Sequence, residues 1–326
     1  MARFPMDVQR RRATRRSVLA ALGALPIAAS LGRHTFAQNA SPLRIGLHKA
    51  MIYAPALLVR DRLKNYKVEL IYFNAPGDVV TALISNSIDL AYTGLTIAAI
   101  ARSKGQPITV VANAGEKGSA IMVRADSPHE TLADLKGKKI GTQPGGIQDV
   151  LLREELKKAK LDPNDVELLR LAYGEMPLAL ARGSVDAISG NEPSCTQAIR
   201  DGYARLLLYP YDNPVGSING GILTTDSTVS GRADLVRDMV AAHAKATHDL
   251  RTDPEEWASV VNKEYGFDKS VVKQAAPNVD LKWQMDEGFK QHYEAYITRL
   301  REIGLLDTPP DLAKLVNTQF ISDLRF

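Results

Sequence analysis

The segment Ile88-Asp89-Leu90-Ala91-Tyr92-Thr93-Gly94 decides the fold. A helical pattern through Val80 and Leu83 precedes it, and its small and apolar residues are typical of a strand that ends in Thr and Gly. A helix followed by such a strand is typical of a parallel sheet with helical crossovers, and it puts a polar strand end at the edge of that sheet. Ligands bind at this edge, so the segment predicts both a fold class and the place of a site.

The same alternation of strands and helices extends along most of the chain. The first half predicts strands at residues 43–47, 68–73, 89–93 and 109–113, and helices at 55–62, 79–85 and 96–103. A second alternation starts at residue 132 and predicts strands at 166–171 and 185–189, with helices at 150–158, 177–182 and 193–201. A strand at 218–224 is followed by amphipathic helices at 235–251, 254–264 and 287–303, which we interpret as scaffold.

Residues 1–37 are predicted to be an export signal. Arg15-Arg16 stands directly before a short apolar run at 19–27, and Thr35-Phe36-Ala37 offers small residues for cleavage. This arrangement resembles the twin-arginine signal that carries folded proteins across a bacterial inner membrane. A membrane anchor fits less well, because spanning the hydrocarbon takes about 20 apolar residues. We therefore expect a periplasmic protein, and one without a lipid anchor because no cysteine follows the signal.

The charge balance argues against a nucleic-acid partner. Of 41 basic and 37 acidic side chains, residues 1–37 hold seven arginines and one aspartate, so 34 basic and 36 acidic side chains follow the signal. The remaining formal charge of about −2 gives no reason to expect binding to nucleic acid. Cys195 is the sole cysteine, which excludes an internal disulfide and favours a buried thiol over a nucleophile.

Three segments together resemble the extracellular solute-binding proteins of the nitrate, sulfonate and taurine type, which are related to thiamine-pyrimidine binding proteins. The segments are residues 88–94, 134–141 and 179–188, and the resemblance runs from about residue 43 to 304. It implies an α/β, two-lobed periplasmic-binding-protein fold of type II, in which each lobe is a mostly parallel sheet flanked by helices. Lobe one would be residues 41–123 plus 222–326, and lobe two would be 124–221. Two hinge crossovers, near 122–125 and 218–224, would join the lobes beside an interlobe cleft.

Four loops are expected to meet at this cleft, namely residues 47–50, 93–96, 141–146 and 190–194. The candidate ligand-binding residues in or beside them are His48, Lys49, Tyr53, Thr93, Gly94, Thr96, Thr142, Gly145, Gly146, Gln148, Asp149, Asn191 and Glu192. Other interpretations stay open: the threonines at 93 and 96 as plain helix caps, Glu192 as a carboxylate favoured by a helix dipole, and Tyr53 as core. His48 and Lys49 fit either a solvated position or a contact with the ligand.

The glycine turn at 141–146 bears on the ligand class. Its glycines permit a close backbone approach to an oxyanion, but no Gly-Lys-Ser/Thr follows, so it is not a Walker loop. Many sulfonate-type relatives have serine or threonine just after this turn, where this chain has Ile147, Gln148 and Asp149. A carboxylate at 149 disfavours a simple anion and suits an amine. The ligand therefore stays open between a sulfonate or other organic anion, a zwitterion, and a heteroaromatic such as a pyrimidine.

The resemblance implies a solute-binding component of an ABC importer. We expect a monomer that binds a small-molecule ligand and docks on an inner-membrane permease, with no catalytic residues, no metal and no cofactor. The alternative of a secreted enzyme is disfavoured because HExxH, G-x-S-x-G, paired cysteine ligands and a dinucleotide fingerprint are all missing. A sensor built on the same fold is a third class that the sequence does not separate from the first.

Overall fold

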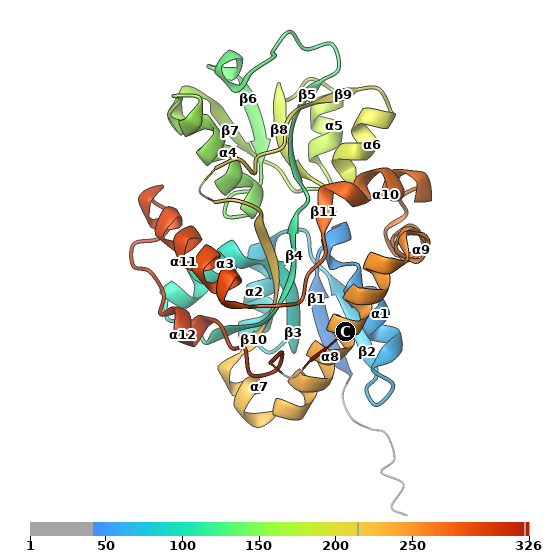
Figure 1. Cartoon of the computed structure of the whole chain (residues 1–326). Coiled ribbons are helices and arrows are strands. Elements are labelled where there is room, and N and C mark those ends of the chain that lie inside the picture. Colours follow the sequence, from blue (N-terminus) through green and yellow to red (C-terminus); the bar gives the residue numbers. More distant parts are fainter. Residues whose placement is uncertain (1–41, 214, 323, 326) are drawn as a thin grey trace, which may run out of the picture. The chain divides into compact units, whose positions relative to one another are not determined.

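The computed structural model describes residues 42–213, 215–322 and 324–325. Eleven strands of this part of the chain form two sheets (Figure 1). The predicted export signal at 1–37 lies outside the described residues. None of the helices within the described ranges is both long enough and apolar enough to cross a membrane.

The larger sheet has six strands and contains the segment quoted above. In spatial order they are β11 (Val279–Asp280), β4 (Ile108–Lys117), β10 (Ile218–Thr225), β3 (Leu90–Gly94), β1 (Leu43–Leu47) and β2 (Val68–Tyr72). β1 pairs in parallel with β2 and β3, whereas β10 runs antiparallel to both β3 and β4. β11 closes the far edge antiparallel to β4.

The smaller sheet has five strands. Their order is β7 (Glu167–Arg170), β6 (Lys139–Thr142), β8 (Ala187–Asn191), β5 (Ser119–Arg124) and β9 (Ala204–Leu208). β6 is parallel to β7 and β8, and β5 is antiparallel to β8 and β9. The chain enters this sheet at Gly118, directly after β4, and returns to the larger sheet between Leu208 and Ile218.

Both sheets are mixed, where the sequence predicts mostly parallel ones. β3 and β4 do run in the same direction, as the helical crossover between them requires, but β10 is inserted between them and opposes both. The strands predicted from the sequence do not include β5, β9 or β11, and each of these three pairs antiparallel. The strands that carry the chain between sheets are therefore the source of the antiparallel pairs. The division into lobes at 123/124 and 221/222 stays a prediction.

Helices cover both faces of each sheet. Those before residue 210 are α1 (Pro55–Arg62), α2 (Pro76–Ile84), α3 (Leu95–Ser103), α4 (Ile147–Lys158), α5 (Met176–Ala181) and α6 (Ser194–Arg200). Those after it are α7 (Asp226–Gly231), α8 (Ala233–Thr252), α9 (Pro254–Tyr265), α10 (Lys269–Ala275), α11 (Glu287–Glu302) and α12 (Leu312–Leu315). Short 3₁₀ turns are η1 (Met51–Tyr53), η2 (Leu132–Leu135), η3 (Pro163–Asp165) and η4 (Ala276–Asn278).

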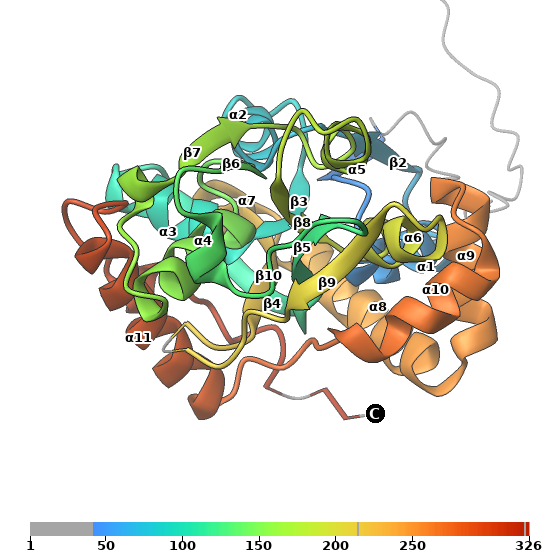
Figure 2. The ribbon, with the colours of Figure 1, turned by 90° about the horizontal axis from the view of Figure 1, so that it is seen from above.

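The smaller sheet has a separate apolar cluster on each face. Leu152 and Leu156 of α4 pack on one face, while Met176 and Leu180 of α5 pack on the other together with Cys195 of α6. Figure 2 shows α4 on one side of this sheet and α5 and α6 on the other. The free thiol is buried, as the sequence predicts.

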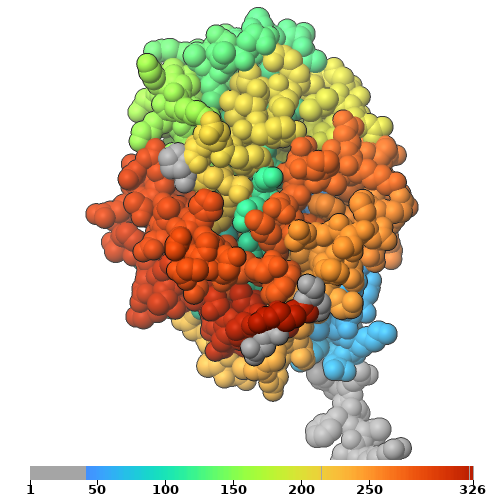
Figure 3. Space-filling model, viewed as in Figure 1, coloured from blue at the N-terminus to red at the C-terminus, as the bar shows by residue number. Residues whose placement is uncertain are grey.

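The C-terminal helices pack against the larger sheet. In the view of Figure 3, residues after about 233, orange to red, cover much of the face over this sheet. Leu235, Met239 and Tyr293 from these helices belong to the same buried cluster as Ile45 and Leu90 of the sheet. The expectation that these helices serve as scaffold agrees with this packing.

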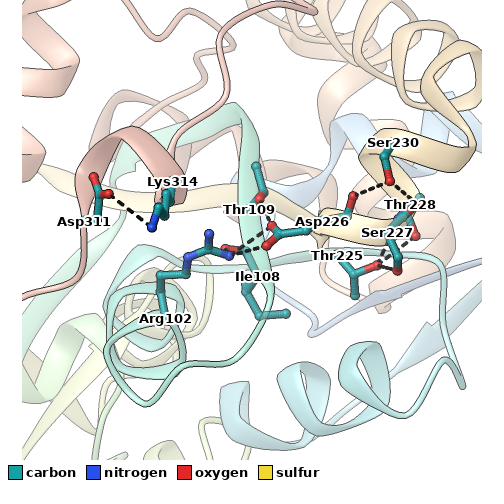
Figure 4. A network of polar contacts seen from close by, with 10 residues as sticks. All are labelled: Arg102, Ile108, Thr109, Thr225, Asp226, Ser227, Thr228, Ser230, Asp311 and Lys314. Atoms are coloured by element: carbon teal, nitrogen blue, oxygen red, sulfur yellow. Dashed lines mark hydrogen bonds and ion pairs between the residues drawn. The ribbon is translucent and has the colours of Figure 1, made fainter.

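A polar network fixes the end of β10. Arg102 from the last turn of α3 donates to both carboxylate oxygens of Asp226, at 2.9 and 2.7 Å, and Thr109 donates to the same carboxylate at 2.5 Å (Figure 4). Asp226 stands at the first position of α7, where a carboxylate also favours the helix dipole. The network thus ties α3, β4 and the turn after β10 together, which holds the returning strand in place.

Candidate functional site

An enclosed space lies where loops of the two sheets meet, and we call it the inner cavity. Its volume is about 410 Å³, counting the opening at its mouth. The lining residues come from strand ends and helix starts of both sheets: His48, Ala50, Ile52, Tyr53, Pro76, Gly94, Gly118, Gly145, Gly146, Ile147, Gln148, Tyr173, Asn191, Glu192, Asn219 and Val279. The rule that ligands bind at the carboxyl ends of strands therefore leads to this place.

His48 follows β1 and is held by aromatic rings. Its imidazole stacks on Tyr173, with ring centroids 5.5 Å apart, and meets the edge of Tyr53 at 4.8 Å. Burial lowers the pKa of His48 to about 4, because a low dielectric disfavours the imidazolium. The ring is therefore neutral at pH 7, and its Nδ1 atom is buried without a hydrogen-bond partner in the described structure.

Gln148, in the first turn of α4, organises the side of the cavity that belongs to the smaller sheet. The Tyr173 hydroxyl donates to Gln148 Oε1 at 2.6 Å, and Gln148 Nε2 donates to the Ser119 hydroxyl at 3.0 Å. Ser189 donates to the Gln148 carbonyl at 2.8 Å. The close approach of Tyr173 depends on Gly146, because a Cβ atom there would overlap the tyrosine hydroxyl. Gln148 is thus oriented by both of its amide atoms.

Glu192 joins the two sheets at the back of the cavity. Its carboxylate accepts from the backbone N–H of Thr196 at 3.1 Å and from Nδ2 of Asn278 at 2.8 Å. Burial raises the pKa of Glu192, and these two hydrogen bonds oppose the rise. Met51 N also donates to the Glu192 carbonyl, at 3.4 Å. Among the described residues, the one acidic side chain that lines the cavity is therefore committed to protein contacts.

Two helices start at the cavity without a side-chain cap. α3 follows Gly94 and α4 follows Gly146, and neither N-cap glycine has a side chain that could accept from the N–H groups of the first two helical residues. Free N–H groups at a helix start attract anions. Buried hydroxyls of Thr93 and Thr142, at the ends of β3 and β6, also lack a hydrogen-bond partner among the described residues. Buried polar atoms without partners are rare, and a bound ligand is one explanation for them.

The cavity is polar but carries little charge. None of its lining residues is a lysine or an arginine, as far as the described part of the chain shows. Its polar groups are a neutral imidazole, two tyrosine hydroxyls, the amides of Gln148, Asn191 and Asn219, and the Glu192 carboxyl. Burial raises the pKa of Tyr53 and of Tyr173, so both stay protonated donors.

A wider space adjoins the inner cavity, and we call it the outer hollow. Its volume is about 930 Å³ with its open mouth, and it shares His48, Tyr173 and Asn191 with the inner cavity. The rest of its lining is Lys49, Tyr72, Phe73, Asn74, Ala172, Gly174, Glu175, Ser194, Tyr265 and Phe267.

Most predicted site residues come together here. His48, Tyr53, Gly94, Gly145, Gly146, Gln148, Asn191 and Glu192 line the inner cavity, and Lys49 lines the outer hollow instead. Thr93 and Thr142 are buried beside the inner cavity without lining it. Whether any of them contacts a ligand stays a prediction.

Two predicted residues are engaged elsewhere. Asp149 is buried and pairs with Arg153 one turn later, Nε to Oδ1 3.2 Å, and its carboxylate also accepts from Gly145 N at 3.3 Å. Its charge is therefore compensated. Contrary to our expectation, Asp149 does not line the cavity, where it would repel an anion. The Thr96 hydroxyl bonds to the hydroxyl of Tyr296. Neither residue lines the inner cavity.

The lining residues that are not among the predicted ones include Tyr173, Gly118 and Asn219. Tyr173 follows the strand predicted at 166–171, so the same strand-end rule would have found it. Gly118 and Asn219 lie where the chain changes sheets, and the Asn219 amide donates to the Lys117 carbonyl across that crossing. No local pattern marks such a pair, which is 101 residues apart in sequence.

Comparison with known proteins assigns a family. Residues 64–257 match the family model described as NMT1/THI5 like. An Escherichia coli K12 protein named as an aliphatic sulfonates-binding protein is 29% identical over 259 residues, which is 76% of this chain and 80% of that protein.

Solved structures share the fold. The alkanesulfonate-binding protein of Xanthomonas axonopodis pv. citri, bound to MOPS, is 25% identical with a TM-score of 0.76, covering 86% of this chain and all of that one. A ligand-binding component of an ABC-type import system from Staphylococcus aureus reaches a TM-score of 0.79 at 20% identity, over 87% of this chain and 99% of that one. A desulfurization enzyme has the same fold, at 17% identity and a TM-score of 0.65, over 85% of this chain and 97% of that one. The chain thus has the periplasmic-binding-protein fold.

Proposed function

The chain belongs to the NMT1/THI5-like family, and from this premise we propose that it binds a small organic sulfonate, or a related organic anion or zwitterion, in the inner cavity. It is the solute-binding component of an ABC importer, as its binding-protein relatives indicate. The periplasm is the compartment in which such a component works.

The observation that carries the proposal is a pair of helix starts without side-chain caps, at a cavity that no lysine or arginine of the described residues lines. Gly94 and Gly146 bring the first-turn N–H groups of α3 and α4 to the same space. Helix N-termini stabilise a negative group by about 0.3–2 kcal/mol each, without any lysine. The unpaired hydroxyls of Thr93 and Thr142 and the neutral His48 ring add hydrogen-bonding capacity suited to several sulfonate oxygens.

A heteroaromatic ligand such as a pyrimidine is the second candidate. The rings of His48, Tyr53 and Tyr173 border the cavity, and amides at Gln148 and Asn191 offer both donors and acceptors. Flat rings with ring nitrogens suit this combination. An anion has the advantage that the two helix starts favour negative charge.

Catalysis is not part of the proposal. The relatives that are similar over most of this chain are binding proteins, and the desulfurization enzyme shares only the fold. His48 is buried and neutral, its ring stacks on Tyr173 and meets the edge of Tyr53, and no side chain among the described residues hydrogen-bonds to its Nδ1 atom. The arrangement serves recognition rather than proton transfer.

Export by the twin-arginine route remains our proposal for residues 1–37. Replacing Arg15 and Arg16 by lysine should leave the precursor in the cytoplasm, and unchanged periplasmic accumulation would contradict the route. We likewise propose a monomer whose two lobes, 41–123 plus 222–326 and 124–221, close on the ligand before docking on the permease. Scattering in solution, with and without ligand, tests both the mass and the closure.

Calorimetric titration of the protein from residue 38 onward tests the ligand class. The panel is methanesulfonate, taurine, nitrate, sulfate and 4-aminopyrimidine. We expect heat of binding with a sulfonate. Binding of 4-aminopyrimidine alone would transfer the proposal to the second candidate, and binding of none would contradict the assignment of the cavity.

A further inference from the structure

We propose that the outer hollow is a second subsite, which takes an aromatic tail of the ligand whose polar head lies in the inner cavity. The inference rests on the proposed function, because it needs a head group that the inner cavity holds. It narrows the ligand from sulfonates in general to aryl sulfonates and similar ring-bearing organic anions.

The inner cavity and the outer hollow adjoin each other. His48, Tyr173 and Asn191 each line both the inner cavity and the outer hollow. A substituent on a head group in the inner cavity is therefore separated from the outer hollow only by these shared side chains. The stacked pair of His48 and Tyr173, 5.5 Å between ring centroids, is part of this shared wall.

The lining of the outer hollow suits a ring. Tyr72, Phe73, Tyr265 and Phe267 bring four aromatic side chains to it from the larger sheet and the segment around the end of α9. Tyr72 is 38% exposed, and its ring meets Tyr265 edge to face with centroids 6.2 Å apart. A ligand ring that covers Tyr72 buries this apolar surface and adds a further aromatic contact.

The charges at the hollow also favour a π-system. Lys49 Nζ lies 5.7 Å from the centroid of the Tyr72 ring. Glu175 lines the other side, where its carboxylate accepts from Ala172 N at 3.0 Å. The cation attracts the face of any ring placed beside Tyr72, whereas a tail with a full charge meets Lys49 and Glu175 with opposite effects.

The sizes of the two spaces suggest different positions for a ring and for a short alkyl group. The outer hollow is the larger space, since a water-sized group has about 360 Å³ open to its centre there, against about 20 Å³ in the inner cavity. A methyl group on the head would stay within the inner cavity and leave the aromatic surface of the hollow to water. A phenyl group reaches past His48 and Tyr173 into the hollow.

The test compares two ligands that share a head. Methanesulfonate and benzenesulfonate are titrated calorimetrically into the wild type, Tyr72→Ala, Phe267→Ala and the control Tyr66→Ala. Tyr66 is a half-buried tyrosine that lies away from both spaces and bonds to Asp238 at 3.0 Å. Wild type should bind benzenesulfonate more tightly, and each hollow variant should weaken benzenesulfonate about three- to tenfold while methanesulfonate keeps its Kd. Tyr66→Ala should change neither Kd.

The outcomes separate this inference from the proposed function. Equal Kd values for the two sulfonates in the wild type, or an equal loss for both in Tyr72→Ala and Phe267→Ala, would leave the sulfonate site standing and overturn the subsite. Binding of neither sulfonate would overturn the proposed function and the subsite with it. Because Phe267 and Tyr72 lie on different elements, a folding defect in one variant leaves the other to decide.

Discussion

The inner cavity and the contact between α4 and α11 both join the two sheets, and they do so with opposite chemistry. At the cavity, α4 presents Gly146 and Gln148, and the polar groups that line the space with them are neutral apart from the Glu192 carboxyl. Two turns later, Glu154 of α4 pairs with Arg299 of α11, Nε to Oε2 2.6 Å, and Arg299 also bonds to Glu302. The N-terminal end of α4 thus borders the cavity, while its middle is held to α11 by an ion pair.

This difference shows which polar groups already have a protein partner and which are still available to a ligand. The Glu154 carboxylate is almost fully buried, with 1% of its side chain exposed, so its charge is tolerable only while Arg299 stays beside it. In the cavity the unpaired groups gain only when a ligand arrives. We therefore expect the Glu154–Arg299 pair to stabilise the folded protein, whereas the unpaired groups of the cavity are expected to stabilise a bound ligand.

The largest effect should come from breaking the contact. Arg299→Ala leaves a buried carboxylate without its cation, and we expect the free energy of unfolding to fall by about 3–5 kcal/mol. Denaturant titration at pH 7 measures this. The matched control is Arg237→Ala, which removes an exposed arginine from its i,i+3 pair with Asp234 and should cost less than about 0.5 kcal/mol.

A double variant sharpens the same point. Glu154→Met with Arg299→Met removes both charges and replaces them with apolar side chains, which often recovers stability. A double variant as unstable as Arg299→Ala alone would show that packing, rather than the lone charge, is what the single variant loses.

Acidification should lower the free energy of unfolding, because two buried histidines are neutral in the folded protein. The pKa of His48, which lines the cavity, and the pKa of His243, which lies in α8 and bonds to the Asn113 carbonyl, are both lowered to about 4 by burial, whereas an unfolded histidine titrates near 6.5. The unfolded state therefore binds more protons between these values, and stability is lost as pH falls from about 6.5 to 4. Each histidine contributes up to about 1.4 kcal/mol per pH unit.

Variants assign this pH dependence to its residues. His48→Gln and His243→Gln should each make the curve of unfolding free energy against pH shallower in that window. Glu192, whose pKa is raised, works in the opposite direction in both variants and cancels when the slopes are subtracted. A slope that does not change in either variant would contradict the neutral imidazoles.

Gln148→Ala tests whether the cavity wall is pre-ordered. The change leaves the Tyr173 hydroxyl and the Ser119 hydroxyl without the amide that joins them, which should cost about 1–3 kcal/mol of stability. Gln197→Ala is the control, because Gln197 bonds only to Asp201 on the exposed side of α6. Equal stability of the two variants would mean that Gln148 does not hold the wall.

The sequence predicts the cavity better than the contact, for a physical reason. The loops that follow strands can be predicted from local sequence patterns. They include His48, Gly94 and Asn191, all of which line the cavity. The Asp149–Arg153 pair was also readable, since four residues on a helix make one turn. Glu154 and Arg299 are 145 residues apart, and only the folded chain brings them together. The antiparallel insertion of β10 escapes local patterns in the same way.

Thr93→Ala should have the smallest effect on stability and the most specific effect on binding. The Thr93 hydroxyl is buried without a partner among the described residues, so removing it breaks no protein hydrogen bond and should change the unfolding free energy by less than about 0.5 kcal/mol. Thr224→Ala is the control, because the Thr224 hydroxyl donates to the Asp89 carbonyl at 2.9 Å, and its loss should cost about 1 kcal/mol without changing affinity.

The two threonines therefore predict opposite results in two measurements. If the Thr93 hydroxyl donates to a ligand, Thr93→Ala should weaken binding of whichever sulfonate the calorimetric panel identifies by about two- to tenfold. Asn191→Ala, at the end of β8 on the opposite sheet, should weaken it as well. Unchanged affinity in both variants would show that the ligand lies away from these strand ends, and a stability loss in Thr93→Ala equal to that in Thr224→Ala would show that the hydroxyl already has a partner.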